Sequence, residues 1–568
     1  MGDDTLVSDR VIATIACDLE RSPIGTASRL LRDFGGRSVL RRAVEAVAAV
    51  GGIERIVLLA PAAQMERIRG EVGGIDDGRV CVMELLARPQ GLDARIRRGR
   101  MWDLVSWRGG AGQWTVFDED YHPQAVAEAA KATGAEHVLC VPAHGALLDA
   151  GLLAALVHHH LHKNNEMKFT YTPAAPGLCG IVLRAGVVAE MAAVGGGGVT
   201  PGMLLGYDPK APNFDSLIRD ACMQVDPALS KIQNRFLLDT ERSWGVAEAL
   251  LAKMPSASAA AMALAARDLP VETRAALPRE VEIELTGRRR THPPGCVPAM
   301  IREGRGELDA GRWVEWMRNL LRPRDCAPND EGQPKGCTPK WDDLLVTFCG
   351  DGDPLMYGGL LGVLEAARGA GVAGICVQTD LLAGTDVLIE AANRGLVDVI
   401  SVQCYGDDAA TYAKVSGIDG YADVMAGLMK LAPVAAATAT LVVPRLLKVR
   451  ETIPQMEAFF DKWILQGCWV VIDGPTDRAG GVPFAGVVDM APPKRRPCRR
   501  IADRMLIRAS GTAVACDQDM NDRLALGNIE GKSLAELWRG MNPLRELHAD
   551  GKWSEVTPCG TCREWHRA

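Results

Sequence analysis

The sequence predicts a multidomain α/β protein, and three observations lead to this fold class. The chain has 568 residues, which at about 100–200 residues per domain corresponds to about three or four domains. Short apolar runs rich in β-branched residues alternate with Ala-rich amphipathic segments in both halves, which is the pattern of βαβ units. Hydrophobic residues make up 48% of the sequence, enough for ordinary buried cores.

Residues 1–204 are expected to form the first α/β domain. Strands are predicted at residues 11–18, 55–61, 137–143 and 180–186, and amphipathic helices at residues 39–50 and 124–133. Four glycines at 195–198, followed by Thr200 and Pro201, indicate a loop where the domain ends. Helical patterns then dominate, and the Ala-rich stretch 255–270 ends at Pro270. Residues 205–277 are therefore predicted to be a helical bridge.

A second α/β domain is predicted over residues 278–490. Six candidate strands lie at 281–287, 344–350, 374–380, 398–404, 438–444 and 468–474. Six βα units predict parallel strands curved into a partial (β/α)6 barrel. Ligands of such sheets bind at the carboxyl ends of the strands. Polar and Gly-rich residues collect at these ends, at 350–354, 379–380, 405–408 and 473–475.

The last segment, residues 491–568, is short, rich in turns and contains four cysteines. Cys559 and Cys562 form a C-x2-C pair, and Cys498 and Cys516 precede it. Two thiolates at this spacing reach one metal centre from a tight turn, and two more complete a four-sulfur set. The spacing alone leaves zinc and an iron–sulfur cluster open. The sequence therefore predicts a small metal-binding module.

Composition excludes several classes of protein. The net charge of −7 argues against a nucleic-acid binder held by bulk positive charge. Sixteen cysteines are too few for a disulfide scaffold. No apolar run is long enough for a membrane span, and the acidic N-terminal residues lack the apolar stretch of a signal peptide. A cytoplasmic protein with thiols free or on metal is expected.

The cysteine module resembles the SPASM segment of radical S-adenosylmethionine (SAM) proteins. The matching features are a hairpin with Gly511, the sequences LGNI (526–529) and SLAELW (533–538), and the four cysteines. In that family such cysteines hold an auxiliary [4Fe–4S] cluster. The resemblance implies one auxiliary cluster on Cys498, Cys516, Cys559 and Cys562. The first part of the longer family pattern, which would hold a second cluster, is absent.

The resemblance extends upstream into the predicted barrel. VEIELTG (281–287), CGDGDPL (349–355), VQTDLLAG (377–384) and residues 412–428 are similar, in order and spacing, to segments of the radical SAM core. Asp353 stands where that family has the Glu of its Gly-Glu-Pro motif. The resemblance implies a pocket for SAM that includes the following residues: Gly350, Gly352, Asp353, Pro354 and Thr379.

The cysteine motif of the radical SAM core is incomplete. Without gaps, its three cysteine positions hold Arg289, Pro293 and Cys296. Arginine and proline cannot ligate iron, and one cysteine does not hold a [4Fe–4S] cluster. Three interpretations stay open: the barrel is a pseudoenzyme; other cysteines rebuild the site; or the alignment is wrong or another chain completes the site. The cysteines that would rebuild it, beside Cys296, are Cys326, Cys337 and Cys349.

The basic run 288–290 allows two interpretations. It is either a solvated loop or an anion site at the mouth of the strands, where the cluster would otherwise lie.

The N-terminal domain resembles nucleotidyltransferases of the cytidylyltransferase type, which have the fold of nucleotide-diphospho-sugar transferases. Residues 34–47 match well, whereas the loop 22–26 has one glycine and little of the positive charge that a triphosphate needs. His144 stands where the family has a magnesium-binding Asp, and Asp149 is expected to begin the next helix. The resemblance therefore implies a domain that has lost catalysis. Of the histidines at 158–162, only pairs such as His158 and His162 share a helix face, which favours a solvated helix end over a zinc site.

The three resemblances together are those of the spiro-SPASM type of protein. The main hypothesis is a radical SAM/SPASM iron–sulfur protein, degenerate or a partner subunit, in the modification of a peptide, cofactor or envelope sugar. The alternatives are a non-catalytic iron–sulfur scaffold that docks a protein partner, and a nucleotidyltransferase-like protein that binds a nucleotide or sugar. One [4Fe–4S] cluster is expected. The binding of SAM, the substrate and enzymatic activity itself are left open.

Overall fold

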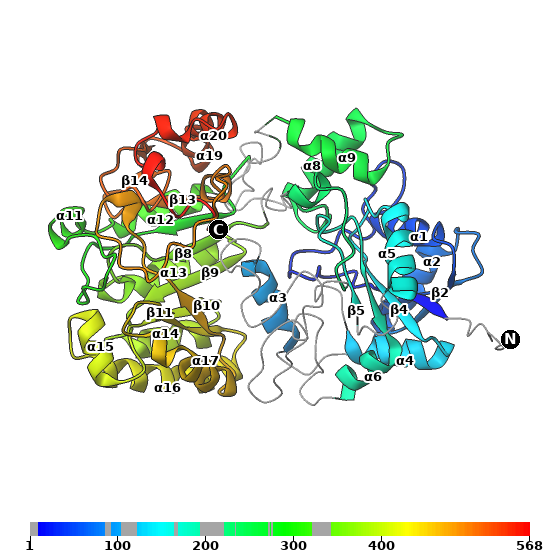
Figure 1. The fold of residues 1–568 in the computed structure, drawn as a ribbon, viewed down its shortest axis with the longest axis horizontal. Coiled ribbons are helices and arrows are strands. Elements are labelled where there is room, and N and C mark those ends of the chain that lie inside the picture. The colour runs from blue at the N-terminus through cyan, green and yellow to red at the C-terminus, as the bar shows by residue number, and fades with distance from the viewer. Residues whose placement is uncertain are drawn as a thin grey trace, which may run out of the picture. The chain divides into compact units, whose positions relative to one another are not determined.

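The computed structural model divides into two compact units. The structure describes residues 10–85, 92–103, 122–163, 169–193, 221–232, 234–270, 273, 276–320 and 342–567. The first unit is formed by Met1–Arg100 and Gln113–Arg274, and the second by Met101–Gly112 and Ala275–Ala568 (Figure 1). As far as Arg274, the predicted helical bridge belongs to the first unit, and the cysteine module belongs to the second unit. The boundaries of the four predicted domains stay predictions.

The first unit contains a six-stranded mixed sheet in the order β3-β2-β1-β4-β6-β5. Strands β3, β2, β1 and β4 are parallel, and β6 is antiparallel to both β4 and β5. The strands are β1 (Val11–Ala16), β2 (Ile53–Ala60), β3 (Val80–Glu84), β4 (His137–Pro142), β5 (Phe169–Thr170) and β6 (Ile181–Arg184). The helices are α1 (Val39–Ala48), α2 (Met65–Val72), α4 (Pro123–Thr133), α5 (Ala150–Lys163), α6 (Ala185–Ala193), α8 (Glu241–Lys253) and α9 (Ala259–Ala265). Helix α3 (Leu92–Asp103) is divided between the units.

Alternation along β1 creates two hydrophobic cores in this unit. Val11, Ala13 and Ile15 pack in a core with residues of α1 and α5, whereas Ile12 packs in a second core with residues of α4 and α6. Successive side chains of a strand point to opposite faces of its sheet. A sheet covered by helices on both faces therefore results, as the alternating apolar segments predict.

The second unit contains a nine-stranded sheet in the order β12-β11-β10-β9-β8-β7-β13-β14-β15. Strands β7 to β12 are parallel and lie in chain order, and β13 pairs with β7 in parallel. The strands are β7 (Glu280–Ile283), β8 (Leu345–Phe348), β9 (Gly374–Thr379), β10 (Val399–Cys404), β11 (Leu441–Leu447), β12 (Val471–Asp473), β13 (Arg504–Ile507), β14 (Thr512–Val514) and β15 (Ala525–Asn528). The curvature of these strands into a partial barrel stays a prediction.

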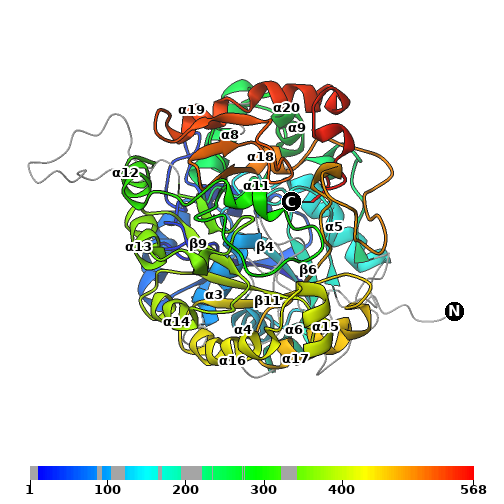
Figure 2. The same cartoon turned by 90° about the vertical axis from the view of Figure 1, so that its left-hand side faces the viewer.

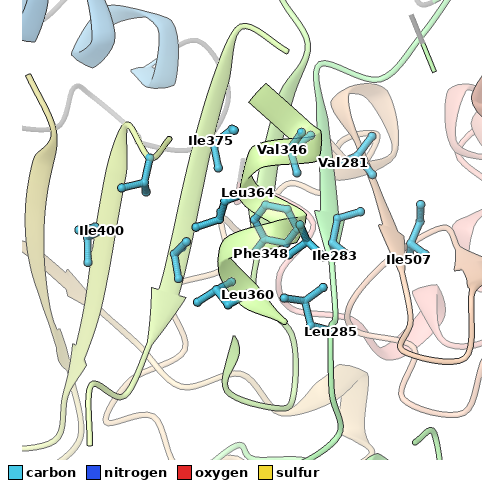
Figure 3. Packing of buried hydrophobic residues seen from close by; sticks show 14 of the residues in the cluster. Val281, Ile283, Leu285, Val346, Phe348, Leu360, Leu364, Ile375, Ile400 and Ile507 are labelled. Carbon is cyan, nitrogen blue, oxygen red and sulfur yellow. The ribbon is translucent and has the colours of Figure 1, made fainter. Parts of the chain in front are cut away.

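Helices connect the parallel strands and cover one face of this sheet. They are α11 (Ala299–Glu303), α12 (Ala310–Leu320), α13 (Leu360–Gly369), α14 (Thr385–Asn393), α15 (Ala409–Ser416), α16 (Tyr421–Ala437) and α17 (Met456–Leu465), followed by α18 (Arg500–Asp503), α19 (Leu534–Arg539) and α20 (Asn542–Ala549). Helices α12, α13, α14 and α16 follow one another around the outside of the sheet (Figure 2). Val281 and Ile283 of β7 and Phe348 of β8 pack there, together with Leu360 and Leu364 of α13 (Figure 3).

The opposite face of β7 carries charge. Glu280, Glu282 and Glu284 alternate with the apolar residues and are paired with arginines; Arg504, for example, lies 3.0 Å from Glu280 and 3.4 Å from Glu282. Buried carboxylates of this kind are tolerated only when they are paired and hydrogen-bonded. The helix-free side of the sheet is therefore polar, and its carboxyl edge is where the polar loops predicted from the sequence begin.

The ten strands expected from the apolar runs are all present. Five further strands of the described residues lie outside these runs. Strands β3 and β5 belong to the first unit, and β3 is only half-buried. Strands β13, β14 and β15 belong to the cysteine module, for which the sequence predicts a hairpin at Gly511. The cysteine module also differs from the expectation of a separate module, because β13 extends the main sheet through its pairing with β7.

Candidate functional site

A cavity of about 210 Å³ lies at the carboxyl ends of the parallel strands in the second unit. Its walls come from the loop after β7, the ends of β10, β11 and β12, and the cysteine module. Five arginines contribute to the lining, namely Arg289, Arg445, Arg478, Arg500 and Arg567. Four carboxylates also contribute: Asp351, Asp473, Asp517 and Glu564. The cavity therefore occupies the edge where such folds bind their ligands, and it is strongly charged.

The three positions of the incomplete cysteine motif, Arg289, Pro293 and Cys296, all line this cavity. The loop that carries them is held by Arg302, which is fully buried and donates hydrogen bonds to the carbonyl oxygens of Gly287 (2.8 Å) and Arg289 (3.2 Å). Burial raises the pKa of the Cys296 thiol, although the positive charge of Arg289 acts in the opposite direction. The loop thus presents one protonated thiol to the cavity and no second cysteine from the motif.

Arg289 forms a buried ion pair at the first motif position. Its Nε donates to Asp380 Oδ2 at 2.8 Å, and its Nη2 donates to Asp380 Oδ1 and to the Tyr405 hydroxyl (2.8 Å). Asp380 is fully buried and also accepts a hydrogen bond from Thr291. Burial acts against the charge of Arg289, but the carboxylate of Asp380 raises the pKa of Arg289 above its usual value. A two-pronged arginine–carboxylate pair of this kind is among the strongest polar contacts in proteins.

Asp351 forms a second buried charge cluster beside the cavity. Its carboxylate lies 2.7 Å from Arg305, 2.7 Å from Arg478 and 3.0 Å from Arg508. Burial alone would raise the pKa of Asp351, but the three guanidinium groups lower it below its usual value. Arg305 also pairs with Glu284 of the loop after β7 at 3.0 Å. These pairs tie the loop after β8 to the end of β7 and to the cysteine module.

The residues assigned to a SAM pocket by resemblance make contacts within the protein. Asp353 accepts hydrogen bonds from the Thr379 hydroxyl (2.7 Å), the Asp380 amide (3.2 Å) and the Leu355 amide (3.0 Å). Burial raises the pKa of Asp353 to about 6. A Cβ atom at Gly352 would lie 1.8 Å from the Thr286 carbonyl oxygen, so only glycine fits there.

Gly350 is likewise constrained, with a φ of 118° and the Glu284 side chain against it. None of the five residues of the predicted pocket, which also includes Pro354, lines the cavity described above. Their contact with SAM stays a prediction.

The four C-terminal cysteines are neighbours in the structure. Cys498 precedes α18, Cys516 follows β14, and Cys559 and Cys562 flank a single 3-10 turn. Burial raises the pKa of all four thiols, to about 11 for Cys559 and about 12 for Cys562. The charge of Cys498 acts in the same direction and raises the pKa of each of the other three thiols.

Their surroundings fit an iron–sulfur cluster. The Gln518 amide donates to Cys516 Sγ (3.4 Å) and the Glu564 amide donates to Cys562 Sγ (3.3 Å). Amide donors to sulfur stabilise cluster thiolates and tune their potential. Arg500 adds a buried positive charge that interacts with Cys516, and its buried Nε has no hydrogen-bond acceptor within the described part of the chain. Iron binds cysteine as the thiolate, so a cluster would hold these four sulfur atoms deprotonated in spite of their high pKa values. Its negative charge would also balance the buried positive charge of Arg500.

The arrangement does not resemble a site for one metal ion. Within the described ranges, no group of three or more His, Cys, Asp or Glu side chains is close enough to share a single ion. A [4Fe–4S] cluster binds each cysteine through a different iron atom, so its ligands are farther apart than those of one zinc ion.

Of the cysteines that could rebuild the core motif, the structure describes Cys296 and Cys349. The charges that act most on the pKa of Cys296 are those of Arg289, Arg302 and Asp351. Those that act most on Cys349 are Glu282, Glu280 and Cys376. The two thiols therefore lie in different surroundings. Cys326 and Cys337 lie outside the described residues.

In the first unit, His144 is buried, and neither ring nitrogen has a hydrogen-bond partner among the residues that the structure describes. Burial lowers the pKa of His144 to about 4. Asp149 accepts a hydrogen bond from the Leu152 amide (3.1 Å), so it caps the start of α5 as expected. His158 and His162 are exposed, with ring centres 4.4 Å apart.

Sequence reasoning missed most of the charged cavity wall. Arg500, Asp517 and Glu564 lie within two residues of a cluster cysteine, and this proximity was a usable signal. Arg445 and Arg478 gave no such signal, because only the fold brings the ends of β11 and the loop after β12 to the cavity.

Comparison with known proteins identifies the C-terminal part. Residues 498–563 match the SPASM family, described as an iron–sulfur cluster-binding domain. This segment is therefore similar to the SPASM domain, and all four cysteines lie within the matched range. A protein of Treponema pallidum (strain Nichols) is 27% identical over 123 residues, which is 22% of this chain and 34% of that relative. The match thus spans about a third of the length of the curated relative.

Solved structures give weaker likenesses. BtrN in complex with AdoMet and 2-DOIA is 13% identical, with 50% of this chain and 93% of that chain covered and a TM-score of 0.32. Streptococcus suis SuiB bound to precursor peptide SuiA is 13% identical (51% and 72% covered, TM-score 0.39). A cytidylyltransferase from Leptospira borgpetersenii serovar Hardjo-bovis is 11% identical (46% and 93% covered, TM-score 0.31). TM-scores this low assign no chemistry to this chain.

In the part of the chain that the structure describes, no helix is both long and apolar enough to cross a bilayer.

Proposed function

We propose that this chain is a degenerate radical SAM/SPASM protein that holds one auxiliary [4Fe–4S] cluster and no core cluster. It acts as a partner subunit in the modification of a peptide, cofactor or envelope sugar. The cluster is held by Cys498, Cys516, Cys559 and Cys562. When bound, such a cluster transfers single electrons or ligates a substrate atom.

The observation that carries this proposal is the buried ion pair between Arg289 and Asp380. A core cluster would need a thiolate at position 289, where a guanidinium is instead held by two bonds to Asp380 and one to Tyr405. Removing Arg289 from this place would leave a carboxylate buried without its partner, which is strongly unfavourable. Pro293 offers no ligand and Cys296 is a single thiol, so the cavity is built for polar contacts instead of iron.

The chain's own residues have distinct roles at the proposed cluster. The amides of Gln518 and Glu564 orient and stabilise two of the thiolates, and Arg500 compensates the negative charge of the cluster. Arg500 is also bonded to Asp517, which lines the cavity. The auxiliary cluster thus borders the cavity in which a substrate or a partner's segment would lie.

For the first unit we propose a nucleotidyltransferase-like fold without catalysis. Support comes from His144, which replaces the magnesium-binding carboxylate by resemblance. Its buried ring with a pKa of about 4 is neutral near pH 7, and neutral imidazole is a poor ligand for a hard cation. No release of pyrophosphate from nucleoside triphosphates is expected, and robust release would contradict this part of the proposal.

The main proposal is tested by iron and acid-labile sulfide analysis after strictly anaerobic purification. We expect about four of each per chain, corresponding to one [4Fe–4S] cluster. With a strong reductant and SAM, the same sample should produce no 5′-deoxyadenosine. About eight irons per chain, or rapid reductive cleavage of SAM by the chain alone, would overturn the proposal. A stable co-purifying protein, in a sample that neither cleaves SAM nor releases pyrophosphate from nucleoside triphosphates, would favour the scaffold alternative over the partner subunit.

A further inference from the structure

We propose that residues 484–499, the loop between β12 and α18, bind the surface of an anionic membrane. The apolar side chains at the start of this surface segment enter the headgroup region of the bilayer, and the basic side chains at its end bind lipid phosphates. The inference goes beyond the proposed function and does not depend on it, because it uses neither the auxiliary cluster nor the core motif.

The first support is a concentration of exposed apolar side chains. In the part of the chain that the structure describes, nine large apolar side chains are exposed, and four of them lie within residues 484–490. The other five are single positions spread between residues 300 and 465. The four are Phe484, Val487, Val488 (64% exposed) and Met490 (65% exposed). Single exposed apolar residues are ordinary, whereas a cluster of them indicates a binding surface.

The second support is a run of cations without counter-charges directly after the apolar residues. Lys494, Arg496 and Arg499 are exposed, and within the described ranges their side chains form no ion pair or hydrogen bond. The only carboxylate between residues 481 and 500 is Asp489, and it pairs with Arg563 at 3.2 Å. The whole chain has a net charge of −7, so this run is a local positive patch on an acidic protein. Anionic lipid attracts such a patch.

The apolar and basic parts are fixed to the same stretch of chain, residues 559–563. The Arg563 guanidinium lies 4.8 Å from the centre of the Phe484 ring and pairs with Asp489. Arg495 donates to the carbonyl oxygen of Cys559 at 2.6 Å. Because both parts are attached to this short stretch, they lie on neighbouring surface of the second unit and can meet one bilayer together.

The form of the surface segment favours a bilayer over a folded protein partner. It contains no helix or strand before α18 begins, and Pro492, Pro493 and Pro497 lack the backbone donors that would add a strand to a partner's sheet. Val488 and Met490 project into solvent, and neither lines the charged cavity. A protein partner would need pockets shaped for these side chains, whereas the fluid headgroup and acyl boundary accepts apolar side chains without preformed pockets.

The test is co-sedimentation of the anaerobically purified full-length chain with vesicles. One set contains phosphatidylcholine alone, and the other contains phosphatidylcholine mixed with phosphatidylglycerol. We expect binding to the anionic mixture to be stronger by about tenfold or more. Raising the salt from about 0.1 M to about 1 M shortens the screening length from about 10 Å to about 3 Å, so it should weaken that binding.

Two double variants separate the contributions of charge and apolar contact. Lys494→Glu with Arg496→Glu should weaken binding to the anionic vesicles by about tenfold or more, because both cations become like charges of the lipid. Val488→Ser with Met490→Ser should weaken binding to a similar extent, because less apolar area enters the bilayer. All four side chains are exposed, so both variants are expected to fold.

The matched control is Met429→Ser with Lys430→Glu, a pair of adjacent exposed residues on α16. It changes one apolar and one basic side chain outside the surface segment and should leave vesicle binding unchanged. Equal weakening by the control and by the charge-reversed variant would overturn the inference, since it would indicate a general effect of net charge.

The inference is also overturned if the wild-type chain binds anionic vesicles no better than neutral ones. If the two double variants then lose a co-purifying protein that the control retains, the surface segment is a protein-binding site instead. Iron content, measured in the same samples, keeps this result apart from the proposed function. Full iron content without vesicle binding contradicts only the membrane site, whereas vesicle binding without iron contradicts only the cluster.

Discussion

Arg289 shows how one substitution changes the chemistry that a site can support. In the proposed alignment Arg289 stands where the radical SAM pattern has a cysteine, and its mostly buried side chain is bound to Asp380, Tyr405 and Thr291. Asp380 depends on this partner, since a buried carboxylate without a counter-charge is costly. The pair is therefore a structural element of the cavity, and a cysteine placed at 289 would not by itself restore a cluster.

The first prediction concerns this pair. Arg289→Ala should lower the free energy of unfolding by about 3–5 kcal/mol, because Asp380 is left buried and unpaired. The measurement is chemical denaturation followed by circular dichroism. Arg290→Ala is the control, since the Arg290 side chain is exposed, and it should change stability by less than about 0.5 kcal/mol. Equal effects of the two variants would show that the ion pair contributes little.

The second prediction concerns the cluster cysteines. Cys559→Ala should reduce bound iron from about four per chain to near zero, because the cluster loses one of its four ligands. Iron analysis and the visible absorption of the cluster measure the effect. Cys81→Ala, which removes a half-buried thiol of β3 in the first unit, should leave iron unchanged. Full iron content in Cys559→Ala would show that the ligands are elsewhere.

Sequence and structure contribute differently at the residue scale. Residue type and spacing single out the four cysteines and the two non-ligating residues at 289 and 293, and their roles stay predictions. The partners of Arg289 could not be predicted, because Asp380 and Tyr405 are 91 and 116 residues away along the chain. Neither could the charged cavity wall, whose arginines come from strand ends and from the cysteine module.

At the scale of elements, apolar runs predicted strands well where both faces are buried. Every residue of β1, for example, is buried, so its sequence is a continuous apolar run. Strand β3 lies at the edge of its sheet and is half-buried, and β5 has only two residues. Neither strand therefore shows a clear hydrophobic periodicity in the sequence. The Ala-rich segment 255–270 was predicted as a helix and forms α9 and a short 3-10 turn.

Helix α5 gives the third prediction, a dependence of stability on pH. His160 of α5 is fully buried between His137 (3.0 Å) and the Thr170 hydroxyl (2.7 Å). Burial lowers the pKa of His160 to about 3, assisted by the charges of His137, Arg184 and His159. Between that value and the ordinary pKa of about 6.5, the unfolded chain binds a proton that the folded chain does not. Stability therefore falls as the pH drops below about 6.5.

His160 alone is expected to contribute a loss of about 2 kcal/mol at pH 5 relative to pH 7.5, from the roughly 1.5 pH units between pH 5 and the ordinary pKa of about 6.5. Denaturation of the full chain at both pH values measures it. His160→Gln should reduce the dependence by about this amount, since glutamine does not titrate, whereas His144 and His548, whose pKa values burial lowers to about 4, keep their own contributions. His158→Gln, an exposed position on the same helix, should retain it. An unchanged pH dependence in His160→Gln would assign the effect to other groups.

At the scale of the whole molecule, the cysteine module is joined to the large sheet. Strand β13 pairs with β7 along four residues, and Arg504 of β13 pairs with Glu280 and Glu282 of β7. Arg508 connects the same strand to Asp351 and Asp522. Cys516 follows β14, and Cys498 precedes α18, which leads into β13. The free energy of binding the proposed cluster is therefore expected to contribute to the stability of the second unit.

The sequence suggested a separate module because its short strands and turns contrast with the long apolar runs before it. Tertiary packing decides which strand pairs with β13, and the hydrophobic periodicity of the sequence does not predict that partner.

The last prediction follows from this connection. Removal of the cluster with a chelator under anaerobic conditions should accelerate hydrogen exchange of the amides in β13 and β7 by about tenfold or more, which corresponds to about 1.4 kcal/mol of local stability. Amides of β1 and β4, in the first unit, should exchange at unchanged rates, because these strands belong to a different sheet from the one that β13 extends. Mass spectrometry of peptides from both units measures the two responses in one sample. Faster exchange in β1 and β4 would indicate general unfolding. Unchanged exchange in β13 would show that the cluster is attached to the fold without stabilising it, as expected for a cluster held by surface loops alone.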